Sequence, residues 1–164
     1  MLTNTIAQVQ ETAFEKRRGV GRVEIRSGYA QVHISQLSEP LTVARLQMLQ
    51  AMADAGISID FLKLTQSGLT FFVPEAAASQ TQQVLTGVAP ALSVTTGRCI
   101  VLISAVNMRD EEGLLAKALS VAIGCGVPID SIGDMHDALL IATTQEGADT
   151  IAHAVTAQLL GRDA

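Results

Sequence analysis

The residues in this sequence best suited to binding chemistry are two aspartates, Asp60 and Asp130, which occupy the same place in a repeated segment. Residues 53–60 and 123–130 align at a constant offset of 70 positions, with glycine on glycine and aspartate on aspartate. The match extends without a gap over residues 43–73 and 113–143, and a repeat of this length indicates a duplicated structural unit. Each unit therefore carries one carboxylate able to receive an ammonium group.

Other reactive residues lack the spacing that catalysis or metal binding requires. The three histidines, His33, His136 and His153, are expected on a strand, a hairpin tip and a helix, which gives neither a metal-ligand set nor a nucleophile–base pair. Gly19-Val20-Gly21 and Gly124-Cys125-Gly126 are only halves of a dinucleotide fingerprint, and no GxxxxGK[ST] motif occurs. We therefore expect a protein that is not an enzyme and that holds neither a cofactor nor a metal.

Charge and hydropathy exclude two classes of partner. A net charge of −5 and a pI near 5.1 argue against nucleic acid, because clustered Lys and Arg would be needed to neutralise phosphates. The one basic cluster, residues 16–18 with Arg22 and Arg26, is interleaved with glutamates and is expected on a solvated strand edge. The longest charge-free run, residues 76–97, is rich in Gln, Ser and Thr, so no membrane span is expected. No signal peptide is visible, which predicts a cytoplasmic protein.

The amino-acid composition favours an oligomer. Apolar residues make up 48% of the chain and charged residues only 16%, so part of the surface must be apolar and is expected to be covered in an interface. The two cysteines, Cys99 and Cys125, have no metal-binding or redox spacing and are expected to be buried free thiols.

The first repeat unit has the pattern of four strands and two helices. Its first helix is expected to begin with Thr42 as the cap, to end at Gly56, and to bury Val43, Leu46, Leu49, Met52 and Ala53. Its second helix is expected to bury Val84, Leu85 and Val88. The expected strands are residues 30–34, 57–64, 69–73 and 91–95, and the expected helices are residues 41–55 and 76–87. This βαββαβ order is that of an α+β ferredoxin-like sandwich.

The second repeat unit follows the same order but ends before a fourth strand. Its expected strands are residues 98–104, 127–133 and 138–143, and its expected helices are residues 112–123 and 146–160. The one unassigned strand is 20–26, which a turn at Ser27-Gly28 would end, so we expect it to cross over and complete the second sheet. The predicted domains are therefore an arm (1–19, a short helix or an ordered arm), a first unit (28–97), and a second unit (20–27 with 98–164) into which the first is inserted.

Each unit offers a possible notch for a small ligand. The loop after the first strand leads into a helix amino terminus, whose free backbone N–H groups can bind a carboxylate. The start of the second strand, residues 57–60 or 127–130, is expected to run beside that loop and to offer an aspartate. A free amino acid has both a carboxylate and an ammonium group, so it could bind the helix N–H groups and the aspartate together. The alternative is that Asp60 and Asp130 only keep the strand edges solvated.

Several segments resemble the aspartokinase family. Residues 107–113 (NMRDEEG) and 126–130 (GVPID) resemble the second ACT domain of an aspartokinase, which typically reads GxGMRxxPG, then a helix, then GINI and an acidic residue. Residues 55–60 (AGISID) resemble the equivalent part of the first ACT domain. The resemblance covers about residues 14–160, and the sequence contains no counterpart of the kinase domain of that family.

The resemblance implies an amino-acid effector, commonly lysine or threonine, usually bound at an interface between the first ACT domains of two subunits. Carried over by position, the implied contacts of the first unit are Ser38, Glu39, Thr42, Val43, the backbone of Ile57, Ser58 and Ile59, and the carboxylate of Asp60. The implied contacts of the second unit are Asn107, Met108, Arg109, Gly113, Val127, Pro128, Ile129 and Asp130.

The sequence therefore predicts a regulatory protein, homodimeric through edge-to-edge or helix-face pairing, that senses an amino acid and acts on a partner. By resemblance, that partner is an aspartokinase catalytic chain. A second interpretation is a ligand-free dimerisation or scaffold module for a metabolic enzyme. Val43 favours it, because it stands where the family has a glycine that lets the backbone approach a ligand. A catalytic role would require a partner that supplies the active-site groups.

Overall fold

A computed structural model of the chain describes residues 3–8, 19–106, 108 and 111–161. The chain divides into two compact units. The central unit is Gly28–Arg98 and contains the first repeat. The flanking unit joins the described residues up to Ser27 with those from Cys99 onward, and it contains the second repeat.

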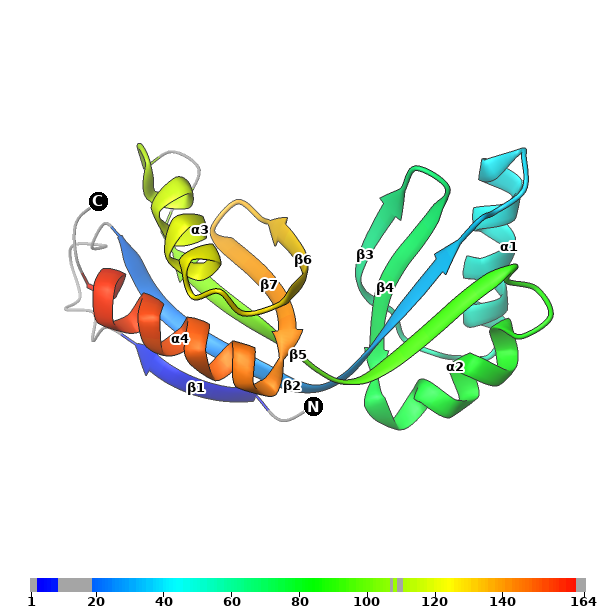
Figure 1. Ribbon diagram of the computed structural model, residues 1–164, viewed down its shortest axis with the longest axis horizontal. Helices are drawn as coiled ribbons and strands as arrows, with labels where there is room; N and C mark the ends of the chain where they lie inside the picture. The colour runs from blue at the N-terminus through cyan, green and yellow to red at the C-terminus, as the bar shows by residue number, and fades with distance from the viewer. Residues whose placement is uncertain (1–2, 9–18, 107, 109–110, 162–164) are drawn as a thin grey trace. The chain divides into compact units, whose positions relative to one another are not determined.

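The central unit is a four-stranded sheet with helices on one face (Figure 1). It takes the second half of β2 (Val20–Ser35) and the first half of β5 (Ala91–Ala105), and its strands lie in the hydrogen-bonded order β3-β4-β2-β5. Its other elements are α1 (Leu41–Asp54), β3 (Asp60–Thr65), β4 (Gly68–Pro74), the short 3-10 helix η1 (Glu75–Ala77) and α2 (Ala78–Leu85). Alternate residues of β2 and β4 share a core with Met48 and Met52 of α1.

The flanking unit repeats this plan and adds one strand (Figure 1). Its strands lie in the order β1-β2-β5-β7-β6, from the first half of β2 and the second half of β5. Its other elements are β1 (Thr3–Gln8), α3 (Leu114–Gly124), β6 (Ile129–Asp134), β7 (Ala138–Thr144) and α4 (Gln145–Leu159). The buried sides of α3 and α4 carry Ala118, Ala122, Ala148 and Ala152, all fully buried in the core of this unit. These small side chains let the helices pack closely on the sheet.

The predicted turn at Ser27-Gly28 is wrong, because β2 runs continuously from Val20 to Ser35. The two strands predicted at 91–95 and 98–104 are likewise one strand, β5. Gly28 and Gly97 have φ values of +83° and +69°, which glycine adopts without steric cost. Each strand therefore passes from one unit into the other through a glycine, without ending.

The predicted buried face of the first helix is wrong at Val43, Leu46 and Ala53, which are exposed. The Arg45 guanidinium donates from Nη2 to the Thr65 carbonyl (2.6 Å) and from Nε to the Gly68 carbonyl (3.2 Å). Residues 45, 48 and 52 lie on one helical face, so this anchoring turns Met48 and Met52 inward and the face of residues 43 and 46 outward.

Three smaller predictions also need correction. Thr42 is not the cap of α1, since Pro40 holds that position and the Glu39 carboxylate accepts from the Leu41 N–H (3.1 Å). The second helix ends at Leu85, so Val88 is exposed rather than buried. β3 begins at Asp60 rather than at residue 57, whereas Gly56 ends α1 in the left-handed conformation as predicted.

The arm is a strand in its described part, not a helix. β1 pairs antiparallel with β2 from Thr3↔Arg26 to Gln8↔Arg22. The edge strand of a sheet has unpaired backbone N–H and C=O groups. An extended segment can form hydrogen bonds with these groups, whereas a helix cannot. Residues 1–2 and 9–18, which the arm prediction also covers, lie outside the described part of the chain.

Gly68, at the start of β4, has no room for a side chain. An added Cβ would overlap the Ile34 carbonyl oxygen and lie 2.8 Å from its carbonyl carbon, both backbone atoms of a paired strand. We expect Gly68→Ala to lower the free energy of unfolding by about 3 kcal/mol, measured by urea denaturation. The matched control is Gly124→Ala at the end of α3, where a Cβ would meet nothing within 4 Å. Equal stabilities of the two variants would show that β2 and β4 can separate enough to admit a methyl group at no cost.

Candidate functional site

One group of predicted ligand contacts lies where α1 begins, beside the β3–β4 turn. Arg45, in the second turn of α1, donates to the carbonyls of Thr65 and Gly68. The Leu37 N–H donates to the Ser67 carbonyl (2.9 Å). The predicted contacts at this end are Ser38, Glu39, Thr42 and Val43, and all four are exposed.

The other group, Ile57 to Asp60, lies where α1 ends. The Ile57 N–H donates to the Met52 carbonyl in the last turn of the helix (3.1 Å). α1 has 14 residues and is therefore about 20 Å long. The prediction that the two segments run side by side in one unit is wrong, because a strand that follows a helix through a short loop must start near the end of that helix.

The flanking unit shows the same separation. The loop before α3 lies near the β6–β7 hairpin, where the Ala105 N–H donates to the Asp137 carbonyl (3.0 Å). The segment from Val127 to Asp130 lies at the other end of α3, where the Gly126 N–H donates to the Ile123 carbonyl (3.1 Å).

The predicted ligand contacts in the flanking unit differ in how deeply they are buried. Met108 is fully buried in the core, so its side chain packs rather than faces solvent. Gly113 and Pro128 are exposed, and Val127, Ile129 and Asp130 are half-buried. The Pro128 carbonyl accepts from the Thr143 hydroxyl (2.5 Å), which fixes the start of β6 against β7. Asn107 and Arg109 lie outside the described residues.

The two helix amino termini differ in how they are capped. In the central unit the Glu39 carboxylate accepts a hydrogen bond from the backbone N–H of Leu41. A side chain of the protein itself therefore satisfies one of the free N–H groups at the start of α1. In the flanking unit Gly113 holds the N-cap position with φ of +77° and has no side chain to accept a hydrogen bond.

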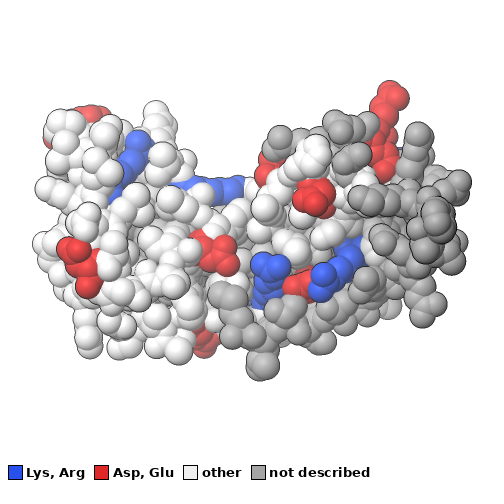
Figure 2. Space-filling model, turned by 180° about the vertical axis from the view of Figure 1, so that it is seen from behind, with Lys and Arg blue, Asp and Glu red and all other residues white. Residues whose placement is uncertain are grey.

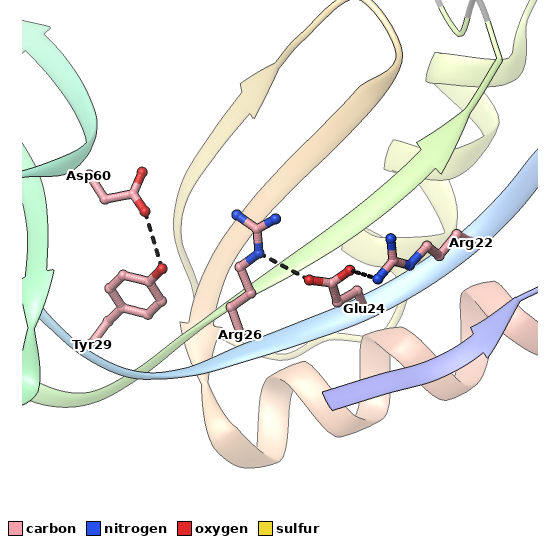
Figure 3. A network of polar contacts seen from close by, with 5 residues as sticks. All are labelled: Arg22, Glu24, Arg26, Tyr29 and Asp60. Atoms are coloured by element: carbon pink, nitrogen blue, oxygen red, sulfur yellow. Dashed lines mark hydrogen bonds and ion pairs between the residues drawn. The ribbon is translucent and has the colours of Figure 1, made fainter. Parts of the chain in front are cut away.

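Asp60 is held by a partner that the sequence patterns did not predict. The Tyr29 hydroxyl, on β2, donates to Asp60 Oδ2 (3.1 Å), and Figure 3 shows the two side chains pointing toward one another. Tyr29 is buried, whereas Asp60 is half-buried at the start of β3. A signal was present in the sequence, since Tyr29 is the only tyrosine in the chain.

A second polar network lies in the flanking unit. Glu24 of β2 is buried, and its carboxylate binds Arg22 Nη2 (2.5 Å) and Arg26 Nε (3.1 Å; Figure 3). Pairing with two guanidiniums offsets the cost of burying the Glu24 charge. The predicted strand edge is wrong for Arg22 and Arg26, because β1 pairs with β2 there, whereas their side chains are exposed to solvent as predicted (42% and 37%).

Charged side chains are sparse on the face of the molecule that Figure 2 shows. In the view of Figure 2 most described atoms belong to uncharged residues, with acidic and basic side chains scattered among them. Within the described ranges, no group of three or more His, Cys, Asp or Glu is placed to hold a metal ion. No described helix is both long and apolar enough to cross a membrane.

An open hollow of about 470 Å³ lies between α3 and α4. None of the predicted contacts lines it, and its lining contains no charged side chain. The lining residues are Ser120, Val121, Gly124, Cys125, Ala154 and Gln158. Both cysteines are free, with Cys99 buried and Cys125 half-buried on the hollow.

Comparison with solved structures gives consistent neighbours for the fold. The regulatory subunit of aspartate kinase from Thermus thermophilus, in its ligand-free form, matches with a TM-score of 0.75 and 18% identity over 87% of this chain and 97% of that chain. A structure of aspartokinase alpha and beta subunits matches with a TM-score of 0.74 and 20% identity over 82% and 95% of the two chains.

A full aspartokinase matches in the same way but over part of its length. Aspartokinase III from E. coli, in complex with lysine and aspartate, matches with a TM-score of 0.68 and 13% identity over 88% of this chain and 34% of that chain. No protein-family model and no curated protein matches the sequence. The resemblance seen in the sequence is thus confirmed in three dimensions, and this chain has the fold of the regulatory subunits and regulatory domains of aspartate kinase.

Proposed function

We propose that this chain is a regulatory protein that binds an amino acid at a site completed by a second copy of itself. In this proposal each unit is an ACT-like ferredoxin-like sandwich. Residues 28–97 are inserted into the unit made of 20–27 and 98–164, and residues 1–19 form an arm. The strand orders β3-β4-β2-β5 and β6-β7-β5-β2 support it, because they are one arrangement used twice.

The observation that carries the proposal is an exposed apolar strip on the central unit. Val43 and Leu46 of α1 are 50% and 60% exposed, and Leu62 and Leu64 of β3 are 43% and 62% exposed. β3 is also the last strand in the hydrogen-bonded order, so its outer edge is open to another strand. An apolar strip beside an open strand edge favours association with a like surface.

Pairing of two such edges about a two-fold axis would reunite the separated halves of the site. Two β3 strands related by a two-fold axis run antiparallel, so the start of one lies beside the end of the other. The α1 amino terminus lies at the end of β3, and Asp60 lies at its start. Asp60 of one copy would therefore lie at the same end of the paired strands as Thr42 of the second copy, with its side chain on the sheet face opposite to α1.

The corresponding surface of the flanking unit is less suited to such pairing. At the offset of 70 residues, the four strip positions become Gly113, Ala116, Ile132 and Asp134. Ile132 is half-buried and packs against the core, and Asp134 is exposed and charged. We therefore assign the dimer interface to the central unit, with a second notch in the flanking unit at Met108, Gly113 and the segment from Val127 to Asp130.

The proposed effector is a free amino acid, with lysine and threonine as the first candidates. Asp60 would receive the α-ammonium group, with backbone groups of Ile57, Ser58 and Ile59 beside it. The α-carboxylate would bind where α1 of the second copy begins, with Ser38, Glu39, Thr42 and Val43 around it, and would displace the Glu39 carboxylate from the Leu41 N–H. The E. coli neighbour was solved with lysine and aspartate, which supports an effector of this class.

Regulation would follow from linkage between ligand binding and the arrangement of the dimer. A ligand that contacts both copies favours the dimer arrangement in which the groups for its ammonium and its carboxylate lie close together. Only a difference in ligand affinity between two dimer arrangements can transmit a signal. The proposed partner is an aspartokinase catalytic chain in the cytoplasm, and the chain would itself hold no catalytic group.

A scaffold module without a ligand is the second candidate. Val43 is exposed at the amino terminus of α1, where its side chain would narrow the approach of a ligand to the backbone. The same side chain belongs to the apolar strip, which a dimerisation module would retain.

Amino-acid binding can be tested by thermal unfolding with each of the twenty amino acids at millimolar concentration. A ligand at about 100 times its dissociation constant adds roughly 2.7 kcal/mol, which corresponds to a rise in Tm of about 5 °C or more for a chain of this size. We expect such a rise for one or two amino acids, with loss of the response in Asp60→Ala if the central site is used. Loss in Asp130→Ala would instead assign the flanking site. A flat panel would favour the scaffold module.

The interface can be tested with charges placed on the strip. We expect Leu46→Glu and Leu64→Glu to convert a dimer into a monomer in sedimentation velocity, because two-fold pairing would bury like charges against apolar partners. The fold should persist, since both side chains are exposed. Ile123→Glu is the matched control, because Ile123 is 59% exposed on α3 of the flanking unit. Dimers that survive both strip substitutions would exclude this interface.

A further inference from the structure

Aromatic side chains gather around Asp60 although the chain holds few of them. The sequence contains four phenylalanines and one tyrosine. Three of these rings are in contact in the central unit, each from a different strand. Tyr29 of β2 meets Phe72 of β4 edge-on (6.5 Å between ring centroids, 86° between planes), and Phe61 of β3 stacks on Phe72 (5.6 Å, 23°).

An irregularity in β3 brings Phe61 into this cluster. Asp60 pairs with Phe72 and Lys63 pairs with Thr70, with a shift of register between the two pairs. In a regular strand, Phe61 would point to the opposite face from Asp60. Its φ of +50° is costly for a bulky side chain, but the bulge lets two consecutive residues serve the same face. Strain of this kind is found at functional sites.

This face already accommodates a cation. The Lys63 ammonium lies 5.2 Å from the centroid of the Phe61 ring, in the geometry of a cation–π contact. Asp60 precedes Phe61 in the chain, and its carboxylate accepts from the Tyr29 hydroxyl at Oδ2. A carboxylate offers about four acceptor positions on two oxygens, so Asp60 can hold the Tyr29 hydroxyl and an ammonium group together.

We propose that Tyr29 is a positioning residue, which orients the Asp60 carboxylate toward the ammonium group of an amino-acid effector. This inference rests on the proposed function and assigns a role to a residue outside the predicted contacts. The Tyr29 ring is fully buried, and its strand is fixed by the pairing Tyr29↔Pro74 between β2 and β4. A hydroxyl held in this way selects one orientation of the carboxylate before the ligand arrives, which lowers the cost of binding.

The test uses Tyr29→Phe, which removes the hydroxyl and keeps the ring. We expect the dissociation constants for L-lysine and L-threonine, each titrated by calorimetry, to rise about tenfold for the amino acid that binds. The matched control is Thr70→Val, which removes a hydroxyl from the same face at a residue whose Oγ1 lies 2.8 Å from His33 Nδ1. The control should bind as tightly as the wild type.

The outcomes separate this inference from the proposed function. If the wild type binds, Asp60→Ala does not, and Tyr29→Phe binds as tightly as the wild type, the positioning role is overturned and the proposed function stands. If the wild-type chain binds neither amino acid in the calorimeter or in the thermal panel, the proposed function is overturned, and the role of Tyr29 in ligand binding falls with it.

A second readout follows from the composition of the chain. It contains one tyrosine and no tryptophan, so its intrinsic fluorescence reports Tyr29 alone. A phenol that donates to a carboxylate emits weakly, because the acceptor promotes proton transfer from the excited ring. We expect Asp60→Ala to raise the emission and Thr70→Val to leave it unchanged. Equal emission from Asp60→Ala and the wild type would show that the contact is absent, and would overturn the inference whether or not a ligand binds.

Discussion

The pairing of β2 with β5 is the constraint on which both units depend. Each of these long strands gives one half to the central sheet and the other half to the flanking sheet, where the remaining strands and the helices are added. Without β2 and β5, each sheet would lose two adjacent strands. Two glycines in the left-handed conformation, Gly28 and Gly97, let the strands pass between the units without a break in the chain. The repeat is thus built on shared strands, rather than as two domains in series.

The direction of the chain in each unit has a direct consequence for the candidate site. A helix that follows one strand and precedes the next sets the loop before it and the loop after it about a helix length apart. The groups that suit a carboxylate and the groups that suit an ammonium ion therefore lie at opposite ends of α1. A small ligand cannot bridge that distance in one unit, whereas the proposed antiparallel pairing of two β3 strands would bring unlike ends together. Dimerisation and ligand binding would then be one event.

Anchoring of α1 by Arg45 links the fold to this surface. Its two bonds to carbonyls of the β3–β4 turn fix the rotation of the helix, so that the methionines face the core and Val43 and Leu46 face outward. The same rotation exposes the α1 half of the apolar strip. At the other end of β3, the bulge at Phe61 and the Tyr29 hydroxyl shape the surroundings of Asp60. Packing inside the unit therefore sets both parts of the proposed interface.

The sequence by itself determined the duplication, the type of nearly every element, and the resemblance to aspartokinase regulatory domains. These properties follow from apolar periodicity, from stops such as Gly56 and from the fixed offset of Asp60 and Asp130, all of which are local. Only the tertiary structure decided that Ser27-Gly28 lies within a strand, that Arg45 rather than Val43 and Leu46 anchors α1, and that Tyr29 contacts Asp60. The reason is physical, because these features depend on partners distant in the chain, which no local pattern identifies.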